Sequence, residues 1–257
     1  MYKIIKIYGE RNTGTQYLKK LIKLNFDLKL LPGILPKPFR IVWFLNLYFP
    51  SLYRRFPLVN WLLDYYFKIT FSKNLGWKHT LIFSELLETS QINLNNVYFI
   101  TITKNPYSWL LSFYNRPYHS QNKYENFEEF LLKPWKTLKC ENYSKDFKNP
   151  IEMWNLKNKF YIDLKEKYIV ENIRYEDLLL NLENVINKIS KRFNISRKYK
   201  IAKNIEISTK DKEKNYNFYY DYYINELWKN KLNKDSINII NKFLDESVLD
   251  YFKYKKI

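Results

Sequence analysis

The first 24 residues contain the pattern that most constrains the fold. Residues 3–8, KIIKIY, form an apolar run rich in isoleucine, which predicts a buried strand. Gly9 and Gly14 then bracket a turn, and apolar residues recur at steps of three and four as far as Leu24, which predicts an amphipathic helix. A strand that feeds a helix through such a loop directs backbone N–H groups and the helix dipole at one place. That place is a natural anion site.

The loop itself, residues 9–16, is close to the nucleotide-binding pattern G-x-x-x-x-G-K-[ST]. Gly9 and Gly14 have the required spacing, but Thr15 stands where the lysine belongs, and Gln16 stands where the magnesium-binding serine or threonine belongs. The loop can therefore hold a phosphate group, whereas a magnesium-dependent kinase or NTPase fits it poorly. An ordinary strand–helix turn without a ligand is the alternative interpretation, because short glycine motifs recur by chance.

Size and charge limit the classes of protein to consider. The chain has 257 residues, of which 46% are hydrophobic, enough for one α/β domain with its own core. The net charge of +18 favours a polyanionic partner: nucleic acid, a phosphate-rich nucleotide, an anionic glycan or a membrane surface. Alternatively, part of this charge reflects a composition that is rich in Lys, Asn, Ile and Tyr.

Cysteine and histidine are too scarce for a disulfide framework or a cysteine-based zinc site. Cys140 is the only cysteine, and His79 and His119 are the only histidines. We therefore predict no metal site. Because the first strand begins without an apolar leader before it, we expect no signal peptide and a cytoplasmic protein.

Two segments stand out from the alternation of strands and helices. Residues 32–71 are rich in proline and aromatic residues, and their apolar runs are shorter than a membrane span. We expect a packed helical excursion there, and a flap that binds a membrane surface or the acceptor is the alternative. Residues 116–149 form a polar, loop-rich insertion. Both belong to a single domain that covers residues 1–257.

The rest of the chain predicts a parallel sheet with helices on both faces. Residues 97–103, VYFITIT, and 169–175, IVENIRY, are further strands, and residues 74–79, NLGWKH, are strand-like. The last helix covers residues 236–252, with Asp235 as its cap. Alternation of this kind is typical of an α/β fold, in which ligands bind outside the carboxyl ends of the strands.

Polar residues gather at three predicted strand ends, which are Gly9–Thr15, Lys78–His79 and Lys104–Ser112. These segments resemble, in the same order, the sulfotransferase family that uses 3′-phosphoadenosine 5′-phosphosulfate (PAPS). YGERNTGTQYLKKLI is similar to the family's 5′-phosphosulfate loop, WKHTLIFSELL to the segment with the catalytic histidine, and VYFITITKNPYSWLLSFY to the 3′-phosphate motif. The resemblance implies a P-loop-like sulfotransferase fold, PAPS as sulfuryl donor and no metal.

The resemblance also implies a role for each matching residue. His79 would be the catalytic base, with Lys78 and Arg11 as cations beside the transferred group. Lys104 and Ser112, eight residues apart, would bind the 3′-phosphate. The 5′-phosphosulfate would lie on Arg11, Asn12, Thr13, Gly14, Thr15 and Gln16, and the basic segment with Lys210 and Lys212 would cover the nucleotide. The acceptor would offer a hydroxyl or amine, on a glycan or on another small or lipid-linked molecule.

Three departures from the family pattern affect these roles. Asn12 stands where the family has lysine or arginine, so either Arg11 or another cation such as Lys78 supplies that charge. Lys104 replaces the usual arginine, which removes the bidentate geometry of a guanidinium on phosphate. The segment with Lys210 and Lys212 lacks the glycine that the family has there.

Other interpretations compete with this one. A non-catalytic protein that binds nucleic acid or another polyanion would explain the charge and the many aromatic residues. The basic residues are spread along the chain, however, and we find no nucleic-acid-binding signature, so we expect no specific nucleic-acid partner. A degenerate P-loop nucleotide-binding protein would explain the loop, and a decayed sulfotransferase that binds nucleotide without turnover would explain Asn12.

Overall fold

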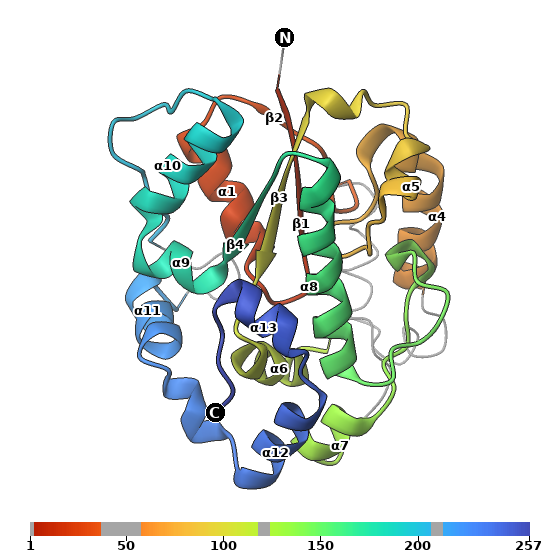
Figure 1. Ribbon diagram of the computed structural model, residues 1–257, viewed down its shortest axis with the longest axis vertical. Coiled ribbons are helices and arrows are strands. Elements are labelled where there is room, and N and C mark those ends of the chain that lie inside the picture. Colours follow the sequence, from red (N-terminus) through yellow and green to blue (C-terminus); the bar gives the residue numbers. More distant parts are fainter. Residues whose placement is uncertain (1–2, 37–57, 118–123, 207–212) are drawn as a thin grey trace.

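The centre of the fold is a parallel sheet. A computed structural model describes residues 3–36, 58–117, 124–206 and 213–257. Within these ranges the sheet has four strands in the order β2-β1-β3-β4, and every neighbouring pair is parallel (Figure 1). The strands are β1 Ile4–Gly9, β2 Lys29–Leu30, β3 Val97–Thr103 and β4 Val170–Arg174.

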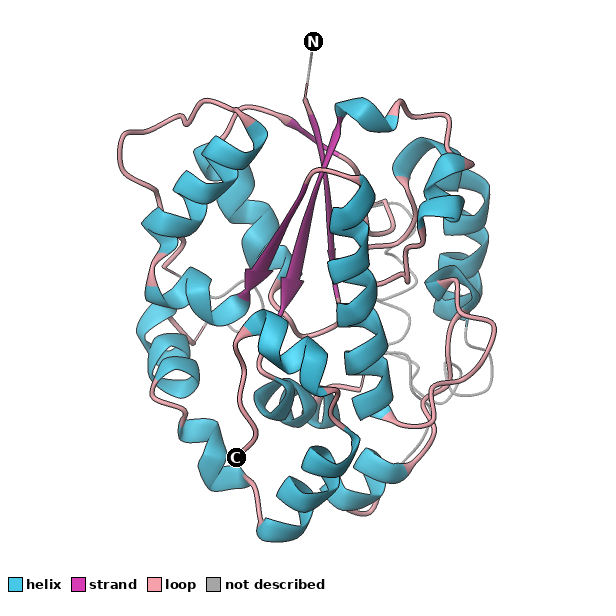
Figure 2. Cartoon of the chain, in the orientation of Figure 1, coloured by secondary structure: helices cyan, strands magenta, loops and turns pink. Residues whose placement is uncertain are grey.

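Helices lie on both sides of this sheet and gather beyond the carboxyl ends of the strands (Figure 2). The α-helices are α1 Thr15–Asn25, α4 Leu58–Asn74, α5 Ser84–Glu88, α6 Pro106–Asn115, α7 Phe127–Leu132, α8 Pro150–Lys167, α9 Tyr175–Leu180, α10 Leu182–Phe193, α11 Tyr216–Ile224, α12 Lys234–Phe243 and α13 Glu246–Phe252. Short 3-10 helices are η2 Leu94–Asn96, η3 Lys139–Glu141 and η4 Leu227–Lys231.

Alternation along the strands divides the core between the two faces of the sheet. Ile5 and Ile7 of β1 share a cluster with Leu21 of α1 and Ile186 of α10 on one face. Tyr8 and its neighbours on the other face join a second cluster that includes α8. Because successive side chains of a strand point to opposite faces, both faces need apolar residues, which explains the nearly continuous apolar runs of β1 and β3.

Lys6 is the exception in this pattern, since it is a fully buried lysine in the middle of β1. Its ammonium group donates to the carbonyl oxygens of Pro32, Asn74 and Gly76 at 2.8, 2.6 and 2.5 Å. Three acceptors satisfy all the protons of an ammonium group, which makes the burial tolerable. Lys6 thereby fastens the chain that leads to His79 onto the central strand.

The predicted α/β fold class is confirmed, including the strand–loop–helix that joins β1 to α1. Residues 74–79 are not a strand, because Leu75 and Gly76 have φ values of 59° and 76°, which interrupt extended backbone. The predicted last helix is two helices, α12 and α13, and Asn233 rather than Asp235 caps the first of them.

The structure describes only part of the segments 32–71 and 116–149, which stand out from the predicted alternation of strands and helices. In the segment 32–71, α4 supplies a helix from Leu58, and residues 37–57 lie outside the described residues. The segment 116–149 contains α7 and η3 between loops, and residues 118–123, among them His119, lie outside the description as well.

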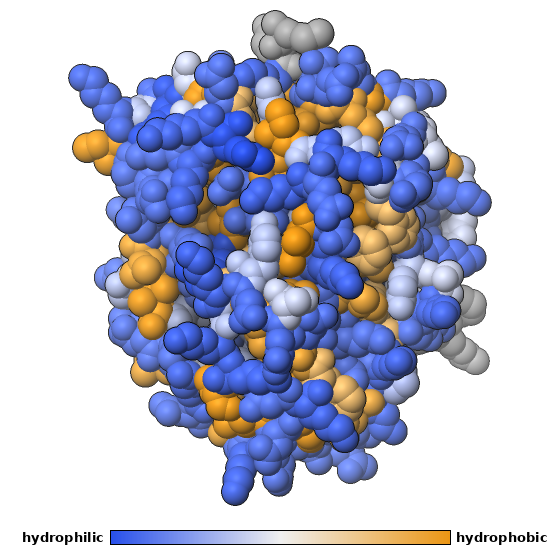
Figure 3. Space-filling model, in the orientation of Figure 1, coloured by the Kyte–Doolittle hydropathy of each residue, from blue (hydrophilic) through white to orange (hydrophobic). Residues whose placement is uncertain are grey.

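On the face drawn in Figure 3, hydrophilic residues dominate and hydrophobic ones form small patches. No helix within the described ranges is long and apolar enough to cross a membrane.

Gly14 cannot be replaced without strain, which leads to a first prediction. Its φ is 89°, and a Cβ atom there would stand 2.5 Å from Cδ2 of Tyr175. We expect Gly14→Ala to lower the free energy of unfolding by about 1–3 kcal/mol, because the residue must adopt a left-handed conformation against a ring. Urea unfolding measures this loss, with Lys188→Ala on the exposed face of α10 as the control. An unchanged midpoint for Gly14→Ala would contradict the loop geometry.

Candidate functional site

A cleft of about 850 Å³ opens at the carboxyl ends of the strands. Its lining brings together nine of the residues that the sequence singles out, which are Arg11, Asn12, Gly14, Thr15, Gln16, Lys78, His79, Lys104 and Ser112. Thr13 is buried beside the cleft, and Lys210 and Lys212 lie outside the described residues. Three segments that are far apart in the sequence therefore meet in one cavity.

The first part of the cleft is the N-terminus of α1. Gly14 occupies the N-cap position in a left-handed conformation and provides no side chain to cap the helix. The first-turn N–H groups of a helix have no acceptor within it, so an anion can bind them. Thr13 stabilises the tight turn, because its hydroxyl and its N–H both donate to the carbonyl oxygen of Glu10, at 2.6 and 3.3 Å.

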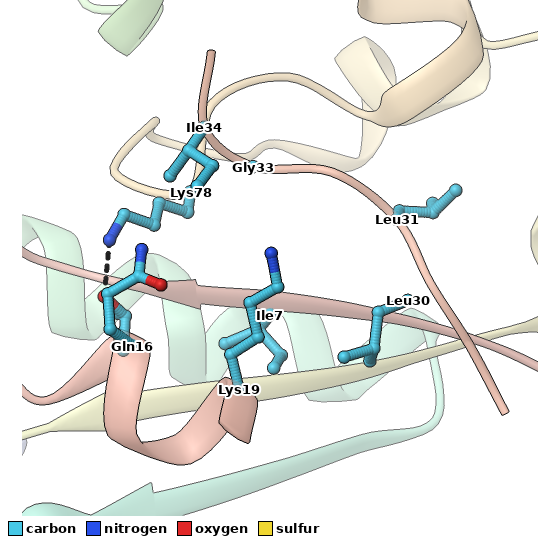
Figure 4. A pocket seen from close by; sticks show the side chains of 9 residues that line it. Ile7, Gln16, Lys19, Leu30, Leu31, Gly33, Ile34 and Lys78 are labelled. Atoms are coloured by element: carbon cyan, nitrogen blue, oxygen red, sulfur yellow. Dashed lines mark hydrogen bonds between the residues drawn. The ribbon is translucent and has the colours of Figure 1, made fainter. Parts of the chain in front are cut away.

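Lys78 adds a positive charge at this helix N-terminus. Its ammonium group donates to the hydroxyl of Thr15 at 2.7 Å, across a small pocket that Gln16 and Lys19 also line (Figure 4). Two backbone hydrogen bonds place Lys78: its N–H donates to Gly33, and its carbonyl oxygen accepts from the N–H of Gly9 at 2.9 Å. Although residues 74–79 are no strand, they lie beside the end of β1.

Arg11 and Asn12 make other contacts. The Arg11 guanidinium forms ion pairs with Glu10 and Glu141, each at 2.8 Å, and lies over the ring of Trp77. The Asn12 side chain donates to the carbonyl oxygen of Arg116, just beyond α6, at 3.2 Å. Arg11 is thus paired with two carboxylates, whereas the ammonium group of Lys78 lies at the N-terminus of α1. A direct role of Arg11 toward the ligand stays a prediction.

Glu10, Arg11, Glu141 and Lys157 form a buried cluster of two carboxylates and two cations beneath the loop. Lys157 of α8 contacts Glu10 at 3.0 Å and Glu141 at 2.7 Å, and its ammonium group also donates to the carbonyl oxygen of His79. Burial raises the pKa of Glu141, but the charges of Arg11 and Lys157 outweigh burial and bring the pKa down to about 2. Glu141 therefore remains ionised at neutral pH, and the cluster connects the loop to the segment with His79.

His79 is buried, with 6% of its surface exposed, and lines the cleft. Its Nδ1 contacts the carbonyl oxygen of Gly9, and its ring packs edge-on against Trp77 at 4.8 Å between centroids. Burial, followed by the charges of Lys78 and Arg11, holds the pKa of His79 well below its usual 6.5. Since a carbonyl oxygen can only accept, Nδ1 carries the proton and Nε2 keeps the lone pair. His79 is thus a neutral ring that can accept a proton at Nε2.

The second part of the cleft surrounds Lys104, immediately after β3. Its ammonium group is almost fully buried and donates to the hydroxyls of Ser112 at 2.9 Å and Tyr223 at 3.0 Å. It also stands 4.4 Å from the ring centroid of Tyr223 and 5.6 Å from that of Tyr175. Burial lowers the pKa of Lys104 to about 7, and the charge of Glu176 opposes that change.

Tyrosines of α11 complete this wall, and the sequence analysis did not predict them. Tyr219, Tyr222 and Tyr223 line the cleft from a helix whose sequence is YNFYYDYYI. The available signal was this density of tyrosines, because such side chains combine a flat apolar ring with a polar end. Glu141 and Lys157 were missed as well, although Lys157 lies on the apolar side of α8 between the buried Trp154 and Tyr161.

The charge of the cleft lining is strongly one-sided. Among the described residues of the lining, the acidic one is Glu206. The basic ones are Arg11, Lys20, Lys78, Lys104, Arg116, Lys214 and Lys231. Such a lining favours a ligand with several negative charges. Within the described residues, no group of three His, Cys, Asp or Glu side chains gathers in a way that could hold a metal ion.

Comparison with known proteins relates the chain to two solved structures. No family model matches the sequence, and no curated protein is similar to it in sequence. The chain is similar to the sulfotransferase domain from the curacin biosynthetic pathway, with a TM-score of 0.46 and 13% identity, over 100% of this chain and 99% of that chain. It is also similar to retinol dehydratase in complex with androsterone and the inactive cofactor PAP, with a TM-score of 0.40 and 13% identity, over 97% of this chain and 78% of that chain.

The lowered pKa of Lys104 predicts a pH-dependent cost of its burial. The unfolded chain keeps this proton up to a pKa near 10.5, whereas the folded chain loses it near pH 7. The cost is therefore complete below pH 7 and disappears as the pH rises toward 10.5. Lys104→Met removes this cost, so its unfolding free energy should exceed that of wild type. We expect this difference to be about 2–3 kcal/mol larger at pH 6 than at pH 9. Urea unfolding at both pH values measures the gain, and equal gains would contradict a charged, buried Lys104.

The buried ion cluster predicts the opposite outcome for Glu141. Glu141→Gln leaves Arg11 and Lys157 with too little negative charge, so we expect a loss of about 3–5 kcal/mol in unfolding free energy at pH 7. The contribution of Glu141 is present above pH 4.5 and is lost as the pH falls toward 2, so the loss should shrink in acid.

Urea unfolding across this pH range measures the effect of Glu141→Gln. Glu246→Gln is the matched control, because it breaks an exposed pair with Lys256 and should leave the unfolding free energy almost unchanged. Equal losses in the two variants would show that the cluster is not the buried network described above.

Proposed function

We propose that this chain is a sulfotransferase that moves the sulfuryl group of PAPS to a hydroxyl or amine of an acceptor, with residues 1–257 as one catalytic domain. One observation carries the proposal. A single cleft brings together the N-terminus of α1, the buried ammonium group of Lys104 and the neutral ring of His79. A nucleotide that carries one phosphate group on each side of its ribose needs two separate anion sites.

The side chains in the cleft fit the two ends of PAPS. N–H groups of the first turn of α1, the side chains of Thr15 and Gln16, and the ammonium group of Lys78 would hold the 5′-phosphosulfate. Lys104 and Ser112 would hold the 3′-phosphate, with the hydroxyl of Tyr223 as a third donor. All of these groups can donate hydrogen bonds to anionic oxygens, as both ends of the nucleotide require.

His79 supplies the base that the reaction needs. PAPS provides a sulfuryl group that is already activated by its bond to phosphate. Nε2 of His79 can take the proton of the acceptor hydroxyl or amine, because burial keeps the ring neutral and Gly9 fixes the proton on Nδ1. Lys78, next to His79 in the chain, places a fixed positive charge at the N-terminus of α1, where negative charge accumulates during transfer.

The acceptor would approach from the apolar part of the cleft. Leu35, Leu63 and Trp77 line the cavity together with His79, whereas the tyrosines of α11 line it together with Lys104. This division favours an acceptor with an apolar or ring-shaped surface beside its hydroxyl or amine. A glycan, a lipid-linked sugar and a small alcohol each meet that requirement.

Binding of the spent nucleotide tests the donor site. We expect 3′,5′-adenosine bisphosphate to bind without magnesium in a calorimetric titration, more tightly than adenosine 5′-phosphate and than ATP with magnesium. Lys104→Ala should weaken the bisphosphate by roughly ten- to a hundredfold, because a charged hydrogen bond is lost, and should leave adenosine 5′-phosphate nearly unchanged.

Lys188→Ala, an exposed lysine of α10, is the control for total charge in this titration. Equal weakening of both nucleotides by Lys104→Ala would remove the 3′-phosphate assignment. No binding of the bisphosphate to wild type at low salt would remove the proposed function.

Transfer itself is tested with sulfur-labelled PAPS and a panel of phenols, alcohols, amines and glycans. His79→Asn keeps an N–H group for the Gly9 carbonyl but has no basic nitrogen, so we expect bisphosphate binding without transfer. Because the pKa of His79 is lowered, the acid decline of the wild-type rate should lie below pH 6.5. Undiminished transfer by His79→Asn would exclude His79 as the base.

A further inference from the structure

Helix α4 presents a row of large hydrophobic side chains to solvent. Leu58, Trp61, Tyr65 and Ile69 are 46%, 58%, 53% and 56% exposed. Their spacing of three, four and four residues places them on one side of the helix. We call these four residues the α4 stripe. Single exposed hydrophobic residues are common on proteins, but a continuous stripe of four large ones marks an interaction surface.

The opposite side of α4 is anchored in the protein, so the stripe is held facing outward. Leu63 and Phe67 are buried in a cluster that includes Trp77, and the Asp64 side chain accepts a hydrogen bond from the N–H of Cys140 at 2.7 Å. Leu63 also lines the cleft. The helix lies at the outer edge of the molecule, on the right in Figure 1.

The chemistry of the stripe suits the boundary between lipid and water. Trp61 and Tyr65 are stacked 5.5 Å apart, and both ring types favour the headgroup region, where one edge can stay hydrated. Lys68 and Lys73 are exposed on the same helix, and the chain carries a net charge of +18. Anionic lipids attract basic residues, so charge and hydrophobic contact would act together.

We propose that α4 docks the protein on the surface of an anionic lipid bilayer, with the α4 stripe in the headgroup region and the helix parallel to the membrane plane. This inference rests on α4 and on the positive charge of the chain, and it does not depend on the proposed reaction. Because Leu63 lies on the inner side of the same helix and lines the cleft, docking would also bring the cleft close to the membrane.

Co-sedimentation with vesicles tests the proposal. We expect the protein to pellet with phosphatidylcholine–phosphatidylglycerol vesicles at low salt, and less with phosphatidylcholine alone. Substituting both Trp61→Ser and Tyr65→Ser should weaken this partitioning by roughly tenfold or more, because it removes the aromatic contact but no charge. Substituting both Leu180→Ser and Ile201→Ser is the matched control, since these residues are 58% and 74% exposed elsewhere.

A fluorescence measurement locates Trp61 directly. Trp61→Phe should keep most of the vesicle binding, because phenylalanine remains hydrophobic. Lipids brominated near the headgroup end of their acyl chains should quench wild-type tryptophan fluorescence more than that of Trp61→Phe, because a Trp61 side chain in the headgroup region would lie close to those bromine atoms. Both serine double variants should keep the wild-type urea midpoint, since the altered side chains are exposed.

Three outcomes would overturn the proposal. Equal vesicle binding by wild type and the Trp61/Tyr65 double variant would show that charge alone binds the lipid. Wild type that does not bind vesicles but self-associates in sedimentation velocity, in a way that the double variant does not, would assign the α4 stripe to a second copy of the chain. Absence of both vesicle binding and self-association would leave the stripe without this role.

Discussion

The buried cluster of Glu10, Arg11, Glu141 and Lys157 is the interaction on which the site depends most. Two carboxylates and two cations pair at distances of 2.7–3.0 Å, and all four side chains are almost fully buried. The four residues come from the loop after β1, from η3 and from α8. Removal of any one would leave a charge in a medium of low polarity, which is costly. Because the ammonium group of Lys157 also donates to the carbonyl oxygen of His79, the same cluster holds the loop after β1 and His79 next to each other.

Lys104 of the cleft contrasts with Lys157 of this cluster. Lys157 lies between carboxylates, whereas Lys104 has hydroxyls and aromatic rings around its ammonium group. A buried lysine without a close carboxylate lowers the stability of the folded chain. The same uncompensated positive charge attracts an anion. Burial lowers the pKa of Lys104, and the negative charge of a bound phosphate would raise it again. These surroundings are consistent with the proposed role of Lys104 toward a phosphate group.

Patterns over short stretches of sequence predicted the elements whose conformation depends mainly on neighbouring residues. β1, β3, β4 and the strand–loop–helix followed from apolar runs and glycine spacing, and the α/β class followed from their alternation. Residues 74–79 were misjudged because two left-handed residues and the carbonyl contacts of Lys6 decide their course, and neither is visible in an apolar pattern. The two-residue strand β2 carries too short a pattern to recognise. Glu141 lies 130 residues after Arg11, so only the tertiary structure reveals their pairing.

Lys6 illustrates how a chain can replace a bound ion. Three carbonyl oxygens around one positive charge make an arrangement that could coordinate a free monovalent cation, yet here the cation is covalently part of β1. It cannot diffuse away, and no change in the surrounding salt can compete with it. The segment that leads to His79 is therefore attached to the sheet independently of the ionic medium. High pH would weaken this attachment instead. Burial lowers the pKa of Lys6, and an uncharged Lys6 would bind the three carbonyl oxygens less strongly.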